Sequence, residues 1–145
     1  MTKQIILIGG MPTAGKSTIA ENLSKQLSLP WISTDQIGII MRAVATREKY
    51  PTLFTWEDYD GMQYLNQFTA DEIADNEFAI SEPIWLGVRK LIEEDDFWKN
   101  GFIIEGAVIV PHLIAKYFPD SSNFKAVFFG DQNTERIRNV VFTRN

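Results

Sequence analysis

The feature that most constrains this chain is a glycine-containing segment that follows an apolar run near its beginning. Residues 10–17 have the sequence Gly-Met-Pro-Thr-Ala-Gly-Lys-Ser, which fits the pattern G-x-x-x-x-G-K-S. Glycines allow such a loop to curl so that successive backbone N–H groups point inward and surround an anion. A helix that begins where the loop ends adds the positive end of its dipole. The pattern therefore predicts a buried strand, a phosphate-binding loop and a helix in direct succession.

Two side chains in this loop have chemistry of their own. The Lys16 ammonium is expected to reach the β- and γ-phosphates of a nucleotide, and the Ser17 hydroxyl is expected to bind Mg²⁺. The alternative is a glycine-rich turn with a surface lysine and no ligand. The residues predicted to bind the nucleotide are Gly10, Met11, Pro12, Thr13, Ala14, Gly15, Lys16, Ser17 and Thr18.

The hydrophobic pattern around the loop predicts an α/β protein. Residues 4–9 are a continuous apolar run, which is typical of a strand buried on both faces of a parallel sheet. Residues 16–27 have apolar positions at helical spacing, residues 31–33 form a second short strand, and a second helix opens at Thr34-Asp35. Strands that alternate with helices indicate a parallel sheet covered on both faces, a three-layer α/β/α arrangement.

The remainder of the chain continues this alternation after an irregular, aromatic segment. Residues 46–80 are predicted to form a helical insertion, which can build a substrate-binding lobe, pack its aromatics on the core, or do both. Ser81 resembles the N-cap of the next helix. Further strands are predicted at 102–105 and 125–129, and helices at 111–118 and 132–141. We expect residues 1–145 to form one domain.

Composition excludes several classes of function. The net charge is −5 and the chain has no cysteine. An acidic chain lacks the diffuse positive potential that nucleic acids and acidic membranes attract, so neither is expected as a partner. Disulfides and thiolate metal sites are impossible, and no apolar run approaches the length of a membrane span. We expect a soluble, cytoplasmic protein.

Polar residues follow the predicted strands at the edge of the sheet where ligands bind. Asp35 is interpreted as the N-cap of its helix, as a carboxylate that accepts the proton of a substrate hydroxyl or helps to hold Mg²⁺, or as both. Arg42 returns to the same helix face and is expected to hold an anionic substrate group, the alternative being a surface ion pair. Glu105 ends an apolar strand and is expected to hold through water the Mg²⁺ that Ser17 binds; alternatively, it accepts a hydrogen bond from a neighbouring backbone N–H.

Charged residues in two later segments have less specific interpretations. Arg136, Arg138 and Arg144 are positioned to stabilise a transferring phosphoryl group from a lid, or else form an exposed basic face. The acidic run at residues 93–96 is interpreted as a solvated helix end rather than a metal site.

Several short motifs together resemble small-molecule kinases of the adenylate-kinase-like, P-loop type. Within that group the chain most resembles 2-phosphoglycerate kinase. The matching segments are Ile6–Gly10, Gly15–Thr18, Ile32–Asp35, Met41-Arg42, Glu105-Gly106 and Val110-Pro111. The resemblance implies a P-loop NTPase fold and ATP-dependent phosphoryl transfer to a hydroxyl of a small metabolite, with ATP and Mg²⁺ as cofactors. Kinases of this type usually have a fifth strand, and we expect this chain to lack that last strand and its helix.

The expected absence of the last strand leaves two other functions open. A nucleotide-binding module without catalysis and an NTPase that uses no acceptor are both compatible with a phosphate-binding loop, because the loop recognises phosphates rather than reactions. An uncovered strand edge would also favour self-association of the chain.

Overall fold

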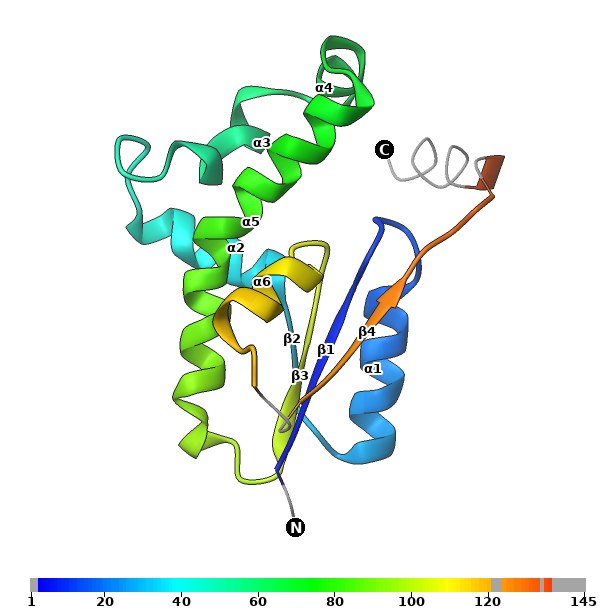
Figure 1. Cartoon of the computed structure of the whole chain (residues 1–145), viewed down its shortest axis with the longest axis vertical. Helices are drawn as coiled ribbons and strands as arrows, with labels where there is room; N and C mark the ends of the chain where they lie inside the picture. Colours follow the sequence, from blue (N-terminus) through cyan, green and yellow to red (C-terminus); the bar gives the residue numbers. More distant parts are fainter. Residues whose placement is uncertain (1–2, 121–123, 134, 137–145) are drawn as a thin grey trace.

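The centre of the molecule is a parallel sheet, which the computed structural model describes together with its helices over residues 3–120, 124–133 and 135–136. The four strands run in the order β2-β3-β1-β4 (Figure 1). They are β1 (Gln4–Gly10), β2 (Trp31–Ser33), β3 (Gly101–Glu105) and β4 (Phe124–Phe129). Every pair of neighbours is parallel, which confirms the predicted sheet.

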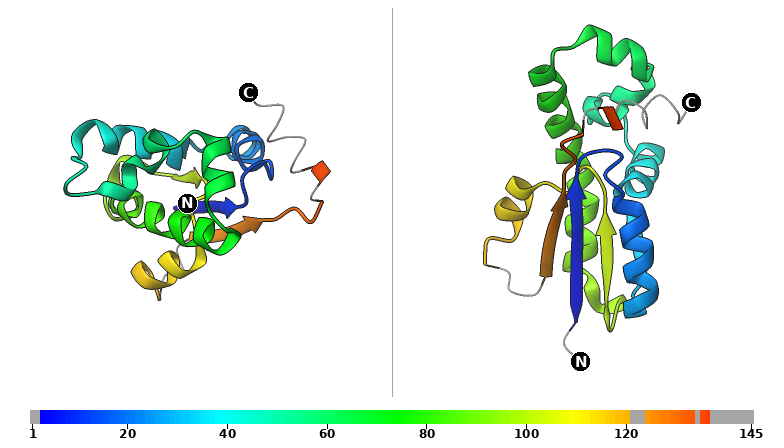
Figure 2. Two further views of the ribbon diagram at one scale, coloured as in Figure 1. Left: turned by 90° about the horizontal axis from the view of Figure 1, so that it is seen from above. Right: turned by 90° about the vertical axis from the view of Figure 1, so that its right-hand side faces the viewer.

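Helices cover both faces of this sheet (Figure 2). They are α1 (Lys16–Leu27), α2 (Thr34–Val44), α5 (Ala70–Glu93) and α6 (Pro111–Tyr117). On one face α1 covers Ile8 of β1 and Ile103 of β3. On the other face α5 and α6 cover Leu7 and Ile104, and α2 packs against α5 beside β2. Because β1 and β3 are buried on both faces, their residues are apolar without alternation. The three-layer prediction is confirmed.

The long helix α5 begins well before the position that the sequence favours. The prediction that Ser81 is an N-cap is wrong: Thr69 caps α5, and its side chain and backbone exchange hydrogen bonds with Glu72. Ser81 lies inside the helix, where its hydroxyl donates to the carbonyl of Glu77 at 2.7 Å. Pro83 also lies inside the helix. The helix continues through this proline because side chains on both sides of it are buried in the core.

Residues 46–80 form a helical lobe above the carboxyl ends of the strands (Figure 1). The lobe contains η1 (Pro51–Phe54), α3 (Thr55–Asp58), α4 (Gly61–Gln67) and the first half of α5. Leu53 and Phe54 join the main core and attach the lobe to it. Four aromatic rings pack on one another with centroids 4.6 to 5.8 Å apart, namely Trp56, Tyr59, Tyr64 and Phe68. The aromatic residues therefore both anchor the lobe and stabilise its interior.

The acidic run lies where α5 ends. Glu93 and Glu94 form ion pairs with Arg89 and Lys90, one helical turn earlier, at 3.1 and 2.6 Å. A short helix, η2 (Asp95–Phe97), then leads towards β3. Across the described residues, no helix combines the length and the apolar character needed to cross a bilayer.

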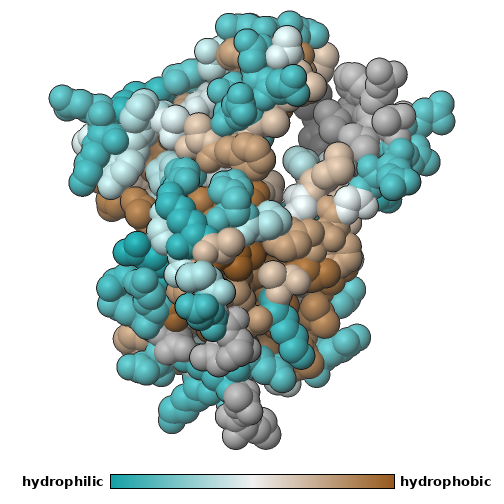
Figure 3. All heavy atoms as spheres, viewed as in Figure 1, coloured by the Kyte–Doolittle hydropathy of each residue, from teal (hydrophilic) through white to brown (hydrophobic). Residues whose placement is uncertain are grey.

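β4 is the edge strand opposite β2, and its apolar side chains are unusually exposed. Val127 and Phe128 are 40% and 41% exposed, and hydrophobic surface covers this part of the molecule (Figure 3). Exposed apolar strands at a sheet edge favour association. Self-association through this edge stays a prediction.

Candidate active site

The loop between β1 and α1 has backbone conformations that glycine permits. Gly10 and Gly15 have φ angles of 120° and 84°, and Thr13 between them also has a positive φ of 67°. A Cβ on Gly10 would lie 2.0 Å from the carbonyl oxygen of Phe129, so β4 excludes any side chain there. The same carbonyl accepts the N–H of Met11 at 2.9 Å. The loop curls tightly against the end of β4, as the glycine pattern predicts.

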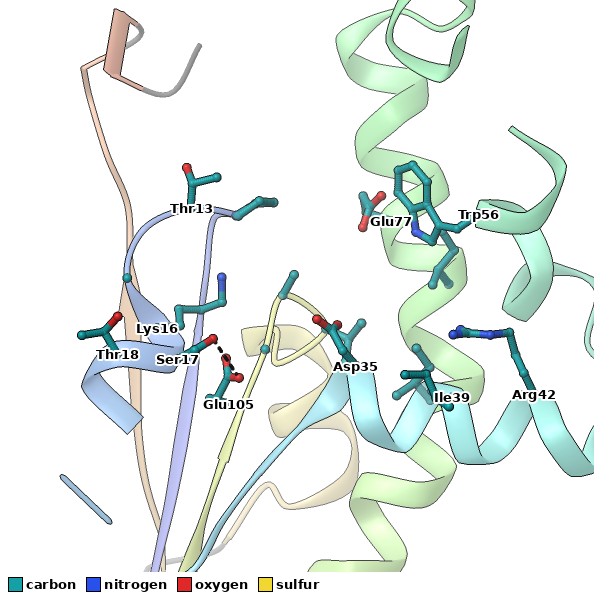
Figure 4. A pocket seen from close by; sticks show the side chains of 18 residues that line it. Thr13, Lys16, Ser17, Thr18, Asp35, Ile39, Arg42, Trp56, Glu77 and Glu105 are labelled. Atoms are coloured by element: carbon teal, nitrogen blue, oxygen red, sulfur yellow. Dashed lines mark hydrogen bonds between the residues drawn. The ribbon is translucent and has the colours of Figure 1, made fainter. Parts of the chain in front are cut away.

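Lys16 is held within this curl. Its side chain is buried, with 8% exposed, and its ammonium donates to the carbonyl of Met11 at 2.6 Å. Figure 4 shows the ammonium directed into the hollow of the loop rather than towards solvent. Because this lysine is buried, the alternative of a surface lysine is wrong. Burial of an ammonium requires compensating polar contacts, and the carbonyl of Met11 supplies one.

Ser17 and Glu105 meet beside the loop. The Ser17 hydroxyl donates to Oε1 of Glu105 at 3.1 Å, and Glu105 is buried with 3% exposed. The sheet brings these residues together because Glu105 at the end of β3 is in register with Ile8, just before the loop. Within the described residues no cluster of three or more His, Cys, Asp or Glu side chains could hold a metal. The Ser17–Glu105 pair therefore offers a hydroxyl and a carboxylate oxygen beside the loop, but not a complete set of metal ligands.

Asp35 and Arg42 extend from α2 on the other side of the loop. The interpretation of Asp35 as an N-cap is wrong: Ser33 is the cap, and its hydroxyl accepts the N–H of Asp35 at 3.2 Å. The helix begins two residues earlier than that interpretation requires, which leaves the exposed Asp35 side chain lining the cavity described next. Arg42, with 28% of its side chain exposed, lies 3.8 Å from Glu57 of α3.

These groups line one cleft of about 430 Å³ between the loop and the helical lobe. Its phosphate end comprises the loop residues Pro12, Thr13 and Gly15–Thr18 together with Glu105. Its lobe end is formed by side chains from α2, α3 and α5, namely Asp35, Ile39, Arg42, Trp56, Glu77, Ile80 and Ile84. Figure 4 shows the two ends facing each other across open space, with Asp35 the labelled lobe-end residue nearest to Lys16 and Ser17.

Sequence reasoning missed several residues of the lobe end, among them Trp56 and Glu77. Burial raises the pKa of the Glu77 carboxyl above its ordinary value. One signal for Glu77 existed: it stands three residues before Ile80 and seven before Ile84, on the side of α5 that lines the cleft. A carboxylate that continues an apolar helix face is unusual enough to single out. Trp56 has no comparable signal, because its position depends on how the lobe folds.

The arginines predicted for the lid lie elsewhere or outside the described residues. The Arg136 Nε pairs with Asp131 at 2.6 Å, and Arg136 does not line the cleft. Arg138 and Arg144 fall outside the described residues.

Comparisons with known proteins show similarity to one kinase family. The chain is 31% identical over 140 residues to a 2-phosphoglycerate kinase of Methanocaldococcus jannaschii, covering 90% of this chain and 42% of that protein. It is 35% identical over 114 residues to the 2-phosphoglycerate kinase of Methanopyrus kandleri, covering 77% and 35%. The chain thus spans about two fifths of the length of these relatives. The resemblance to 2-phosphoglycerate kinase is confirmed.

A solved structure supports the fold. A protein of Chloroflexus aurantiacus, provisionally described as a kinase, matches 99% of this chain and 69% of its own with a TM-score of 0.50 and 17% identity. No family model matches the chain. The match to the Chloroflexus aurantiacus structure, together with the parallel sheet and the loop at the end of β1, identifies the fold as that of P-loop kinases.

Proposed function

Given this similarity to 2-phosphoglycerate kinases, we propose that the protein transfers the γ-phosphoryl group of ATP, with Mg²⁺, to a hydroxyl of a small metabolite. The observation that carries the proposal is the convergence of Lys16, Ser17 and Glu105 at one end of a cleft, with Asp35 towards the other. Anion-binding and proton-accepting groups then face each other across a space of metabolite size.

The phosphate end suits a nucleotide triphosphate. The loop N–H groups and the Lys16 ammonium would stabilise the phosphate oxygens. A hydroxyl and a carboxylate oxygen 3.1 Å apart, from Ser17 and Glu105, match the oxygen ligands that Mg²⁺ prefers. When bound, Mg²⁺ neutralises charge on the phosphate oxygens. The Arg136 and Arg138 side chains are proposed to close over the phosphates. For this, Arg136 would give up its ion pair with Asp131 and contact a phosphate oxygen instead.

The transfer itself needs little more than positioning. The acceptor oxygen forms a bond to the γ-phosphorus while the bond from that phosphorus to the bridging oxygen breaks, and ADP leaves with that electron pair. Asp35 takes the proton of the acceptor hydroxyl. Arg42 would hold an anionic group of the acceptor. Orientation and electrostatic stabilisation supply most of the rate enhancement in such reactions.

The test is an assay of ADP formation with Mg-ATP and a panel of hydroxylated metabolites. The relatives' name makes 2-phosphoglycerate the first acceptor in the panel. We expect acceptor-dependent ADP release that is lost in Lys16→Ala. Lys25→Ala is the matched control, because Lys25 lies on the same helix but is exposed and forms an ion pair with Glu21 on the helix surface.

The two other functions predict different results in this assay. ADP release that is independent of any acceptor would indicate an NTPase. Nucleotide binding by calorimetry without ADP release would indicate a binding module. Undiminished transfer in Lys16→Ala would overturn the proposed kinase function.

A further inference from the structure

Glu77 occupies a position where a carboxylate is costly. It lies on α5, where the helix rises from the sheet into the lobe, and it lines the cleft together with Ile80 and Ile84. Further along the same helix the residues that face the sheet, such as Val88 and Ile92, are buried and apolar. An apolar residue at position 77 would continue this face without any cost of desolvation.

No described side chain compensates this cost. Burial is the cause that raises the pKa of Glu77, and no hydrogen bond or ion pair joins its carboxylate to another described side chain. Carboxylates in such positions either take up a proton or receive hydrogen bonds from a ligand. Since Glu77 lines the cleft, a bound ligand is within its reach.

The surroundings of Glu77 define which ligand fits. Among the described residues, the charged side chains of the lobe end are two carboxylates, Asp35 and Glu77, and one guanidinium, Arg42. Glu57 lies 3.8 Å from Arg42 and already offsets part of its charge. Trp56 adds a half-exposed aromatic ring to the same end of the cleft. Such a site accepts hydroxyl donors and one anionic group, but it repels a ligand with several negative charges.

We propose that Glu77 accepts a hydrogen bond from a second hydroxyl of the acceptor, so that the preferred acceptor is a dihydroxy acid with a single negative charge. Asp35 accepts the proton of the hydroxyl that reacts, Glu77 accepts a hydrogen bond from the neighbouring hydroxyl, and Arg42 binds the acid group. The inference rests on the proposed kinase function and narrows its range of acceptors. An acid that already carries a phosphate on the neighbouring oxygen has no hydroxyl there to donate to Glu77.

The experiment compares acceptors that differ by one hydroxyl. Glycerate has two hydroxyls and one carboxylate, whereas 3-hydroxypropionate and lactate each lack one of the hydroxyls, and 2-phosphoglycerate has a phosphate in place of one. In the wild type we expect kcat/KM for glycerate to exceed that for the better monohydroxy acid by about tenfold, the effect of one hydrogen bond to a charged group. We also expect glycerate to exceed 2-phosphoglycerate.

Variants of Glu77 then test whether this residue causes the preference. Glu77→Ala should bring the ratio of kcat/KM for glycerate to that for the monohydroxy acids close to one, whereas Glu77→Gln, which keeps an accepting oxygen but loses the charge, should retain only part of the preference. Asp75→Asn is the control, because it removes the same charge from an exposed position two residues away. A helix-favouring alanine at 77 should leave folding intact, which circular dichroism checks.

The outcomes separate this inference from the proposed function. Transfer with an unchanged ratio in Glu77→Ala, or a wild-type preference for 2-phosphoglycerate, would overturn the role of Glu77 and leave the kinase function standing. Absence of transfer to every acceptor would overturn the kinase function, and this inference with it.

Discussion

The two ends of the cleft are built in different ways. At the phosphate end the binding groups belong to consecutive residues of one loop, and sheet pairing adds only Glu105. At the lobe end, side chains come from α2, α3 and α5, which are far apart in sequence. Phosphate has the same shape in every nucleotide, so a short backbone device suffices to bind it. An acceptor differs from one enzyme to the next, and its site is assembled by tertiary packing.

The largest expected effects distinguish the phosphate end, which is proposed to bind ATP, from the lobe end, which is proposed to bind the acceptor. Lys16→Ala should lower kcat by about 10²- to 10³-fold, as for loss of one stabilising charge or donor, and should also weaken ATP binding. Asp35→Asn should lower kcat by about 10²-fold, the contribution of a catalytic base, with unchanged ATP affinity. Calorimetry with Mg-ATP and steady-state kinetics measure the two quantities. Weaker ATP binding in Asp35→Asn would mean that the ends do not act separately.

The next effect compares a glycine at the phosphate end of the cleft with a glycine elsewhere in the helical lobe. A Cβ on Gly106 would lie 1.7 Å from the Thr34 hydroxyl oxygen, whereas a Cβ on Gly61, at the start of α4, would meet nothing within 4 Å. Gly106→Ala should therefore destabilise the protein by about 1–3 kcal/mol and displace the adjacent Glu105. Gly61→Ala should stabilise it by about 0.4–1 kcal/mol. Urea denaturation measures both, and equal stability of the two variants would contradict the close contact between β3 and α2.

A third prediction sharpens the role of the Ser17–Glu105 pair. Ser17→Ala removes the hydroxyl while keeping the helix, so the Mg²⁺ concentration for half-maximal activity should rise by about tenfold or more. ATP affinity measured without Mg²⁺ should remain unchanged, because the loop N–H groups and Lys16 are still present. An unchanged Mg²⁺ requirement would show that the metal does not bind at this pair.

The smallest expected effect concerns stability at the lobe end. The folded protein has a raised Glu77 pKa, so Glu77 binds a proton more readily in the folded state than in the unfolded state. Its contribution to stability is therefore fully present below the unfolded pKa and is lost as the pH rises through the folded pKa. Glu77→Gln should be more stable than the wild type at pH 8, with a smaller difference at pH 5. Thermal melting at the two pH values measures this, and a difference independent of pH would argue against a desolvated carboxylate.

The local sequence pattern was sufficient to predict the parts of the fold that depend on residues close together in the sequence. The strands β1, β2, β3 and β4 lie within one residue of their predicted bounds, because each is a short apolar run between turn signals. The helix boundary at Ser81 was misplaced because a serine two residues before a proline resembles a helix start. Burial of α5 in the core overrode that local preference.

The sequence by itself determined the phosphate-binding loop, the parallel sheet and the placement of Lys16, Ser17 and Glu105 at its carboxyl edge. These features follow from backbone geometry. A glycine conformation affects only a few residues, and strand register is fixed along one pair of strands. Only the tertiary structure decided that Glu77 and Trp56 share a cleft with Asp35 and Arg42. Their meeting depends on how the lobe packs over the sheet, and long-range packing leaves no fixed spacing in the sequence.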